Sequence, residues 1–346
     1  MSALSTLLRR REAGIALALL VVIGVTTAIQ PGFLLSSGGW RDLLLTPAIL
    51  VVLAVGQAVV VITRNVDLSV GSVLGLTAYL TGRVFIEAPD LPIVVVALVA
   101  VAAGTALGLI NGAIVAFARV PALVITLGTL YVYRGVALTW AGSDRIDAGD
   151  MPRTFLALGT RQVAGVPVLT IVAAVVLAVV AYYMYTSRGG RQLYAIGSDP
   201  DAAALQGLPV RRRLLGAFAL NGALAGLAGV MFAARYGTVS SGAGVGLELQ
   251  VVGAVVVGGV AIFGGSGTVV GAALGAMLLL TINRALPVVG IPDFWQRAVV
   301  GALIIGAIAL DRVLANRRSH RLAAARDTDQ PGGPGAGPAD REEATP

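Results

Sequence analysis

The sequence predicts an all-α, polytopic membrane protein with about ten transmembrane helices, short broken segments and one short helix outside the membrane. Hydrophobic residues make up 57% of the chain and charged residues 12%, whereas charged residues reach roughly 25% in soluble domains. The mean hydropathy is +0.87. Most of the apolar runs approach the ~20 residues that a spanning helix needs. These observations indicate a chain embedded in a bilayer.

The apolar runs predict the spans in order. We place them at residues 13–29, 42–63, 66–82, 91–118, 121–140, 164–185, 212–235, 247–263, 266–283 and 294–312. Arginines 9 to 11 precede the first run, which favours a first span or signal anchor over a cleaved leader. An even number of spans puts both termini in the cytoplasm. The chain then divides into a cytoplasmic segment (1–12), a membrane domain (13–313) and a polar, disordered cytoplasmic tail (314–346).

The distribution of arginine gives the orientation. Five arginines lie in or next to the 188–213 stretch, which this topology places inside, as the positive-inside rule requires. The outer connections also carry arginines, so the bias is incomplete. The largest outer connection is 141–164, in which three aspartates lie among three arginines.

The 188–213 stretch contains one short helix with clear boundary signals. Asp199 is a suitable N-cap, Pro200 fits the first helical position, Asp201 complements the helix dipole, and Gly207 ends the helix. The predicted element consists of Asp199, Pro200, Asp201, Ala202, Ala203, Ala204, Leu205, Gln206 and Gly207. An ordinary amphipathic loop is the alternative.

Several chemistries lack the residues that they require. The chain has no lysine, so a P-loop for ATP and a Schiff-base site are excluded. It has no cysteine, and its single histidine, His320, lies in the polar tail, so we expect no metal site and no cofactor. The net charge of +7 is spread between apolar runs, which favours membrane topology over nucleic-acid binding.

Polar residues interrupt the second and third apolar runs. Asp67, Ser69 and Ser72 lie there beside a glycine. Irregular backbone at membrane depth persists only when it is buried in protein or lines a wet cavity. The stretch is therefore either a tight cytoplasmic turn, with Asp67 capping the next helix, or a broken segment beside a translocation path.

Four further polar residues lie within or beside apolar runs, where they are costly: Asn111, Arg134, Asn221 and Glu248. The asparagines could bridge helices or contact a solute. Arg134 could extend toward the interface past Tyr131 and Tyr133. Residues 264–267, Gly-Gly-Ser-Gly, predict a reverse turn between two short spans.

Taken together, these motifs resemble those of the sugar-type permeases of bacterial ABC importers, which include ribose, arabinose, xylose, rhamnose and autoinducer-2 permeases. The resemblance covers residues 45–312. It rests on the order and spacing of residues 67–72, 111–112, 126–129, 134–135, 194–197, 221–222, 246–249, 258–259, 264–267 and Gly271. The Thr63-Arg64-Asn65 segment, where many relatives have glycines, and an Ile-Pro and a Trp near the last span are similar to the autoinducer-2 and rhamnose branch.

The resemblance implies a bacterial inner-membrane subunit without its own ATPase site. A permease of this kind works as a pair, with a second copy or a sister permease, and with separate ABC ATPase subunits that use the ATP. An extracytoplasmic sugar-binding protein delivers the solute. The 199–207 element would then be the coupling helix that contacts the ATPase.

Three alternatives remain at this point. A proton-coupled secondary transporter would use Asp67 or Glu248 as its carrier. A branched-chain amino-acid ABC permease would share the architecture but handle a zwitterion. A membrane-embedded scaffold would transport nothing.

Overall fold

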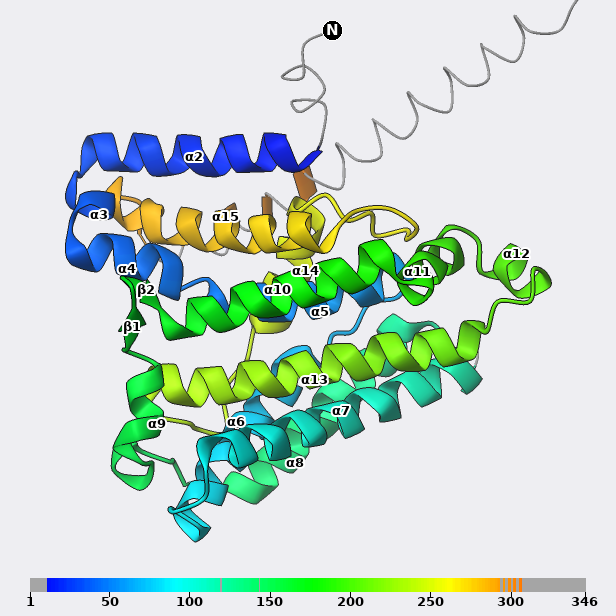
Figure 1. The fold of residues 1–346 in the computed structure, drawn as a ribbon, viewed down its shortest axis with the longest axis horizontal. Coiled ribbons are helices and arrows are strands. Elements are labelled where there is room, and N and C mark those ends of the chain that lie inside the picture. Colours follow the sequence, from blue (N-terminus) through cyan, green and yellow to red (C-terminus); the bar gives the residue numbers. More distant parts are fainter. Residues whose placement is uncertain are drawn as a thin grey trace, which may run out of the picture.

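The fold was examined in a computed structural model of the chain. The structure describes residues 11–292 except 119 and 143, together with positions 295, 298, 299, 301, 302, 305 and 306. The tenth predicted span and the predicted C-terminal tail lie largely or wholly outside these residues, as does most of the predicted N-terminal segment. Helices dominate the described part (Figure 1).

The helices follow one another with little intervening structure. They are α2 (Arg11–Ile29), α3 (Gly32–Leu35), α4 (Ser37–Leu45), α5 (Ala48–Ile62), α6 (Val70–Glu87), α7 (Ile93–Ala118), α8 (Ala122–Ala141), α9 (Arg153–Leu158), α10 (Val168–Thr186), α11 (Arg188–Ser198), α12 (Pro200–Leu205), α13 (Val210–Tyr236), α14 (Leu247–Val257) and α15 (Val269–Val288). A 3-10 turn η1 (Ala148–Asp150) and the strands β1 (Gln162–Val163) and β2 (Val166–Pro167) complete the described elements.

Seven helical segments among the described residues are long and apolar enough to cross a membrane. They are Glu12–Ile29, Ser37–Ile62, Ile93–Ala118, Ala122–Ala141, Val168–Thr186, Val210–Tyr236 and Val269–Val288. The predicted 66–82 span is the buried helix α6, which begins later, at Val70. The predicted 247–263 span is α14, whose 11 residues are about half of what a bilayer requires. The structure thus confirms an all-α membrane fold but not a count of ten spans.

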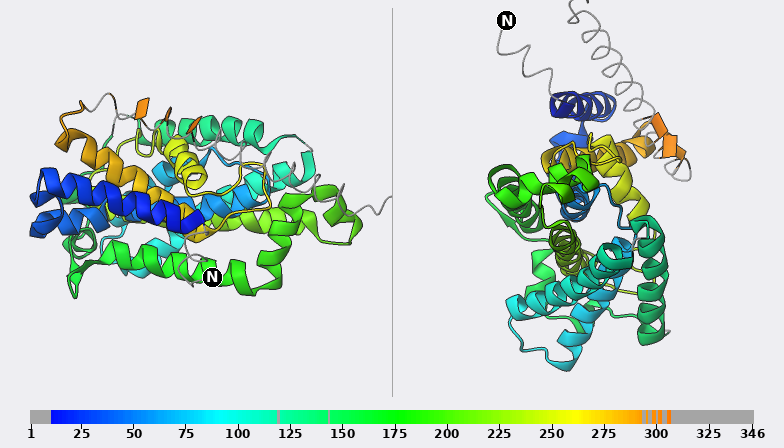
Figure 2. Two further views of the ribbon diagram at one scale, coloured as in Figure 1. Left: turned by 90° about the horizontal axis from the view of Figure 1, so that it is seen from above. Right: turned by 90° about the vertical axis from the view of Figure 1, so that its right-hand side faces the viewer.

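Helix α5 forms the centre of the bundle. Every one of its residues from Ala48 to Ile62 is buried, in accordance with a sequence that is apolar on all sides. Helices α10, α13, α14 and α15 pack around it, and α2 lies at the edge of the bundle against α15 (Figure 2).

Helices α7 and α13 approach closely through glycines. An added Cβ at Gly104 or Gly108 would overlap the backbone of α13 at Phe218 or Gly222, and one at Gly222 or Gly226 would overlap that of α7. Such small-residue contacts hold spanning helices together where no hydrophobic effect acts between them.

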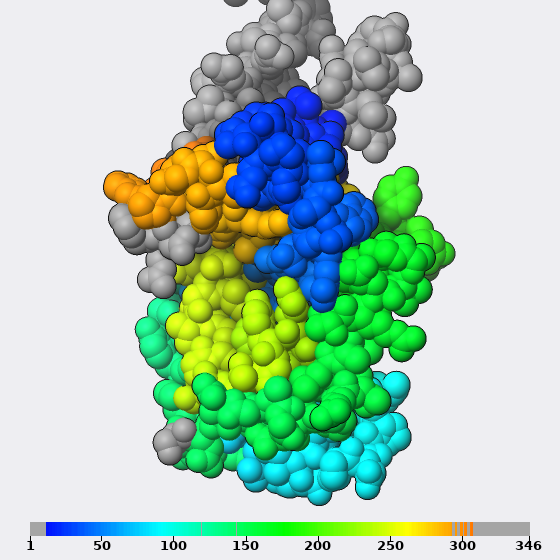
Figure 3. Space-filling model, turned by 90° about the vertical axis from the view of Figure 1, so that its left-hand side faces the viewer, coloured from blue at the N-terminus to red at the C-terminus, as the bar shows by residue number. Residues whose placement is uncertain are grey.

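The two ends of the bundle differ in structure. Helices α11 and α12 lie at one end, and α3, α4, α9 and the β1–β2 hairpin lie at the other (Figure 1). At this second end residues 237–250 occupy the middle of the molecular surface (Figure 3). An isolated bridge between Ile146 and Val239 ties this segment to the 141–164 connection.

Candidate functional site

The break between α5 and α6 carries the densest buried polar cluster in the described residues. The chain leaves the helix at Thr63, turns at Arg64 with φ 68°, and resumes helical structure only at Val70. Asp67 is 2% exposed and Ser69 is fully buried. The Asp67 carboxylate accepts hydrogen bonds from the Ser69 amide at 2.9 Å and the Ser69 hydroxyl at 2.7 Å.

Side chains from three other helices complete this cluster. Asn221 Nδ2 of α13 donates to Asp67 Oδ2 at 3.0 Å, and Asn111 Nδ2 of α7 donates to Ser69 Oγ at 2.7 Å. The hydroxyl of Tyr133 in α8 donates to Asn111 Oδ1 at 3.1 Å. In the amide orientation that satisfies both groups, Gln57 of α5 pairs with the backbone of Asp67, with contacts of 3.2 and 3.1 Å. The cluster therefore joins α5, α7, α8 and α13 at the break.

The geometry favours a broken segment over a cytoplasmic turn. Ser69 and Asp67 bond to Asn111 and Asn221, well inside α7 and α13, and the Val66 carbonyl accepts from Thr126 of α8 at 3.1 Å. This irregular backbone therefore lies within the bundle, buried in protein. Asp67 also accepts from the amide of Ser69, the N-cap residue of α6, but α6 itself has no side-chain cap. The side-chain groups within reach of its carboxylate are donors from this chain, an arrangement that suits a fixed anchor better than a mobile proton carrier.

The remaining predicted polar residues form a second group around the 241–248 segment. Arg134 donates to the carbonyl oxygens of Ser241 at 3.2 Å and Ala243 at 2.6 Å, so it points inward and does not extend to the interface. Glu248 accepts a bond from the Gly246 amide at 3.1 Å. Ser72 donates to the Leu130 carbonyl at 2.9 Å.

A close contact joins the two groups. A Cβ at Gly71, in the first turn of α6, would meet the Glu248 carboxylate and the Gly244 carbonyl, and one at Gly244 would meet the Gly71 carbonyl. The backbones of α6 and of the 241–248 segment thus touch because both positions are glycine.

Two cavities lie on either side of this contact. The first, of about 540 Å³, is lined by residues that include Asn65, Val66, Val210 and Leu214. The second, of about 520 Å³, is lined by residues that include Phe232, Tyr236, Ser240 and Gly244. They lie at opposite ends of α13. Residues 66–71, here termed the barrier segment, link the Val66 wall of the first cavity to the Gly71–Gly244 contact at the second.

The predicted short helix is present with its predicted boundaries. Asp199 Oδ1 accepts bonds from the amides of Asp201 at 3.1 Å and Ala202 at 2.9 Å, Pro200 begins α12, and Gly207 has a φ of 76°. The side chains do not all face the same way. Leu205 is 88% exposed, whereas Ala203 is 5% exposed and packs within the chain. Ala202 and Ala204 are exposed beside Leu205.

Helix α11 connects α12 to the bundle. A Cβ at Gly197 would overlap the Ile62 carbonyl at the end of α5, and the Gly265 amide donates to the same carbonyl at 2.9 Å. The Tyr194 hydroxyl donates to the Gly267 carbonyl at 3.0 Å. Burial, and next the charge of Glu12, raises the pKa of Tyr194, so the hydroxyl keeps its proton. The predicted turn at 264–267 is therefore the surface on which α11 rests.

Comparison with known proteins gives the family. The model of a family described as branched-chain amino acid transport system / permease component matches residues 40–308. The chain belongs to this permease family. It is 36% identical over 333 residues, 96% of each chain, to the autoinducer 2 import system permease protein LsrC of Enterobacter sp. (strain 638). It is 35% identical to proteins of the same name from Shigella flexneri and Escherichia coli (strain K12 / DH10B), in each case over 76% of both chains. No solved structure matches the chain.

The permease is thus a multi-pass transport subunit of the bacterial inner membrane. Its structure brings Asp67, Ser69, Asn111 and Asn221 into one cluster and places Ser72, Arg134 and Glu248 outside it. Gln57 and Tyr133 belong to the cluster but were not predicted. Gln57 carried a signal, because it is a lone polar residue in a 15-residue apolar helix.

Proposed function

We propose that this permease imports a neutral, sugar-like solute of the autoinducer 2 type as the membrane subunit of an ABC importer. The observation that carries the proposal is its similarity, over 96% of the chain, to a protein named as an autoinducer 2 import permease. The order of motifs in the sequence supports the same class of solute.

The cavities support an uncharged solute. Among the described residues, each lining contains one arginine and no carboxylate, and the second lining also contains the aromatic side chains of Phe232 and Tyr236. An ammonium group that loses its hydration is best stabilised by a carboxylate, which neither described lining supplies, whereas hydroxyl groups can exchange water for amide and backbone partners. These walls therefore favour a sugar-like solute over a branched-chain amino acid.

The energy for transport would come from a separate subunit. A chain without lysine cannot build a P-loop, so we infer that ATP is bound and hydrolysed by partner ATPases. Helix α12 would dock on such a partner through Leu205, and α11 would pass the motion to α5 and to the 264–267 turn that it contacts. In this orientation the α12 end and both termini are cytoplasmic.

The opposite end would receive the solute. There, residues 237–250 and the 141–164 connection form the surface (Figure 3). We infer that an extracytoplasmic binding protein docks on this surface, and that the permease works with a second copy or a sister permease in the bilayer.

The test is uptake of labelled autoinducer 2 in cells that express the complete transport system. We expect uptake to stop when the partner ATPase is inactivated. It should persist initially when an uncoupler collapses the proton gradient while ATP is maintained. Loss of uptake when only the proton gradient is collapsed would identify a proton-coupled carrier. If leucine competes with labelled autoinducer 2 as well as unlabelled autoinducer 2 does, the protein is an amino-acid permease.

A further inference from the structure

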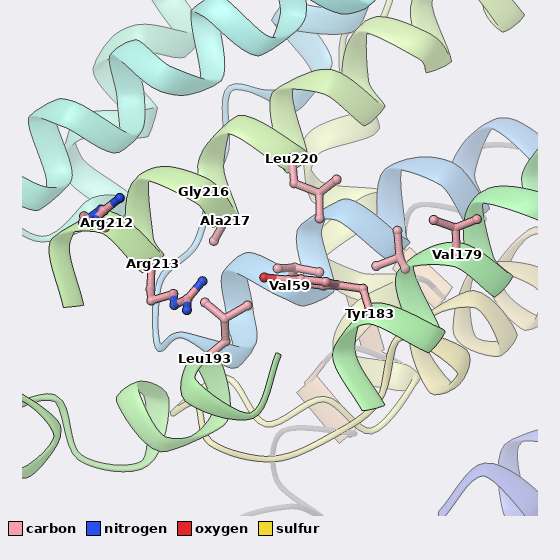
Figure 4. Close-up of a pocket in the computed structure, with 10 residues that line it drawn as sticks. Val59, Val179, Tyr183, Leu193, Arg212, Arg213, Gly216, Ala217 and Leu220 are labelled. Atoms are coloured by element: carbon pink, nitrogen blue, oxygen red, sulfur yellow. The ribbon is translucent and has the colours of Figure 1, made fainter. Parts of the chain in front are cut away.

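A third cavity lies between α10 and α13 and shares no lining residue with the two cavities described above. It has a volume of about 360 Å³, and its lining includes Val59, Val180, Leu193 and Leu220. Arg212 and Arg213, from the first turn of α13, also line it (Figure 4).

The lining changes character from one end of this cleft to the other. In Figure 4 the Arg213 guanidinium and the Tyr183 hydroxyl lie toward the same end, while Val179 lies at the opposite end. Gly189 makes the polar end possible, because a Cβ there would be 2.5 Å from the Tyr183 hydroxyl and 3.0 Å from Arg213 Nη1. A cleft that is cationic at one end and aliphatic at the other matches an amphiphile with an anionic head and an apolar chain.

The position of the cleft fits the boundary between hydrocarbon and water. It lies beside the last turns of α10 and the first turns of α13, both of which end spanning segments. Tyr182 and Tyr185 in the last turns of α10 are exposed, as expected of aromatic side chains at a membrane interface. A bound headgroup would therefore sit at the depth of the surrounding lipid headgroups.

The arginines have free capacity for an anion. Arg213 Nε donates to Gln192 Oε1 at 2.6 Å, which orients the side chain. Its terminal nitrogens have no hydrogen-bond partner among the described residues. Arg212 has no hydrogen bond to another described residue. A phosphate accepts from guanidinium groups, and basic pockets between spanning helices at the cytoplasmic side recognise anionic lipids.

We propose that this cleft binds one anionic phospholipid, with its phosphate on Arg212 and Arg213 and an acyl chain along Val59, Val179 and Leu220. The site goes beyond the proposed transport function. Only the assignment of this lipid to the cytoplasmic leaflet depends on the orientation proposed above. A neutral sugar fits poorly, because the aliphatic end offers no partners for hydroxyl groups. An apolar helix of a second copy would leave both guanidinium groups desolvated.

The test is native mass spectrometry of the purified permease titrated with phosphatidylglycerol or with phosphatidylcholine. We expect one phosphatidylglycerol to bind in preference to phosphatidylcholine. Arg212→Gln and Arg213→Gln should each reduce this preference about fivefold. Arg211→Gln, which removes the same charge, should leave it unchanged, because Arg211 lies 5.4 Å from the centre of the Phe117 ring and outside the cleft.

A second pair of variants tests whether the lipid occupies the volume of the cleft. Gly216 lines the cleft, and nothing lies within 4 Å of an added Cβ there, so Gly216→Leu fills the cleft without a clash at its Cβ. It should abolish binding of the preferred lipid, whereas Gly24→Leu, at an equally open position on α2, should not. Equal binding of the two lipids by the parental protein would overturn the proposal. Unchanged lipid binding in Gly216→Leu would also overturn it, as would displacement of the lipid by glycerol phosphate alone. A Gly216→Leu protein that keeps its lipid but no longer dimerises would overturn it too.

Discussion

A buried hydrogen-bond acceptor without a partner lies next to Asp67, so substitutions of Asp67 can test the role of the buried cluster. Asn221 Oδ1 is buried without a partner in the described structure, while its Nδ2 donates to Asp67 Oδ2. Rotation of the Asn221 amide by half a turn would present that oxygen to a donor at position 67. Asp67→Asn can therefore keep the hydrogen bonds of position 67 to Ser69 and Asn221.

We predict that Asp67→Asn costs less than about 1 kcal/mol of stability and retains most transport. Asp67→Ala leaves the donors of Ser69 and Asn221 unpaired, and each buried unpaired donor costs roughly 1–3 kcal/mol. The two variants are compared by thermal unfolding in detergent and by uptake in cells. Equal loss of transport in both, at normal expression, would give Asp67 a direct role in the pathway.

The contact between Gly71 and the 241–248 segment gives a second prediction for a single residue. Gly71→Ala places a methyl group against Glu248 and the Gly244 carbonyl, and overpacking of this kind costs about 1–3 kcal/mol. We expect a lower unfolding temperature and impaired uptake. Gly128→Ala, with nothing within 4 Å of its Cβ, is the control and should keep both. A Gly71→Ala permease that transports at the parental rate would contradict a functional role of this contact.

Among the elements, α12 offers the clearest test of coupling. Leu205 is its most exposed apolar side chain, and burial of a leucine in an interface contributes about 1.5–3 kcal/mol. Leu205→Arg should keep membrane insertion and unfolding temperature, weaken co-purification of the ATPase, and abolish its stimulation by the binding protein. Leu35→Arg, an exposed leucine at the end of α3 and outside the proposed docking surface of the binding protein, is the control. Ala203→Arg is a poorer test, since Ala203 is buried in its own chain.

The elements also differ in how far the sequence predicts them. Helix α12 was predicted almost to the residue because Asp199, Pro200 and Gly207 act on their immediate neighbours. Helix α11 was missed because Gly189, Gly190 and Gly197 lower its intrinsic propensity, and its packing on Ile62 becomes visible only in three dimensions. Asp67 and Asn221 were recognised separately. Their pairing spans 154 positions of the chain and has no local signal.

At the scale of the whole molecule, the absence of cysteine permits a direct test of orientation. A single cysteine at Gln206, beside α12, should react with a membrane-impermeant maleimide only after the inner membrane is permeabilised. A cysteine at Gln162, in β1 at the other end, should react in intact cells. Both side chains are exposed. The reverse pattern would invert the proposed topology and the placement of both partners.

The shortness of the barrier segment also has an electrical consequence. If water fills the cavities on either side, much of the membrane potential falls across residues 66–71, within which Asp67 lies. Moving one elementary charge through a potential difference of 100 mV changes its free energy by about 2.3 kcal/mol. A carboxylate held by Ser69 and Asn221 does not move through this field, and an uncharged solute carries nothing across it. Import by this permease should therefore be electroneutral, so that its rate at constant ATP does not change when the membrane potential is clamped at different values.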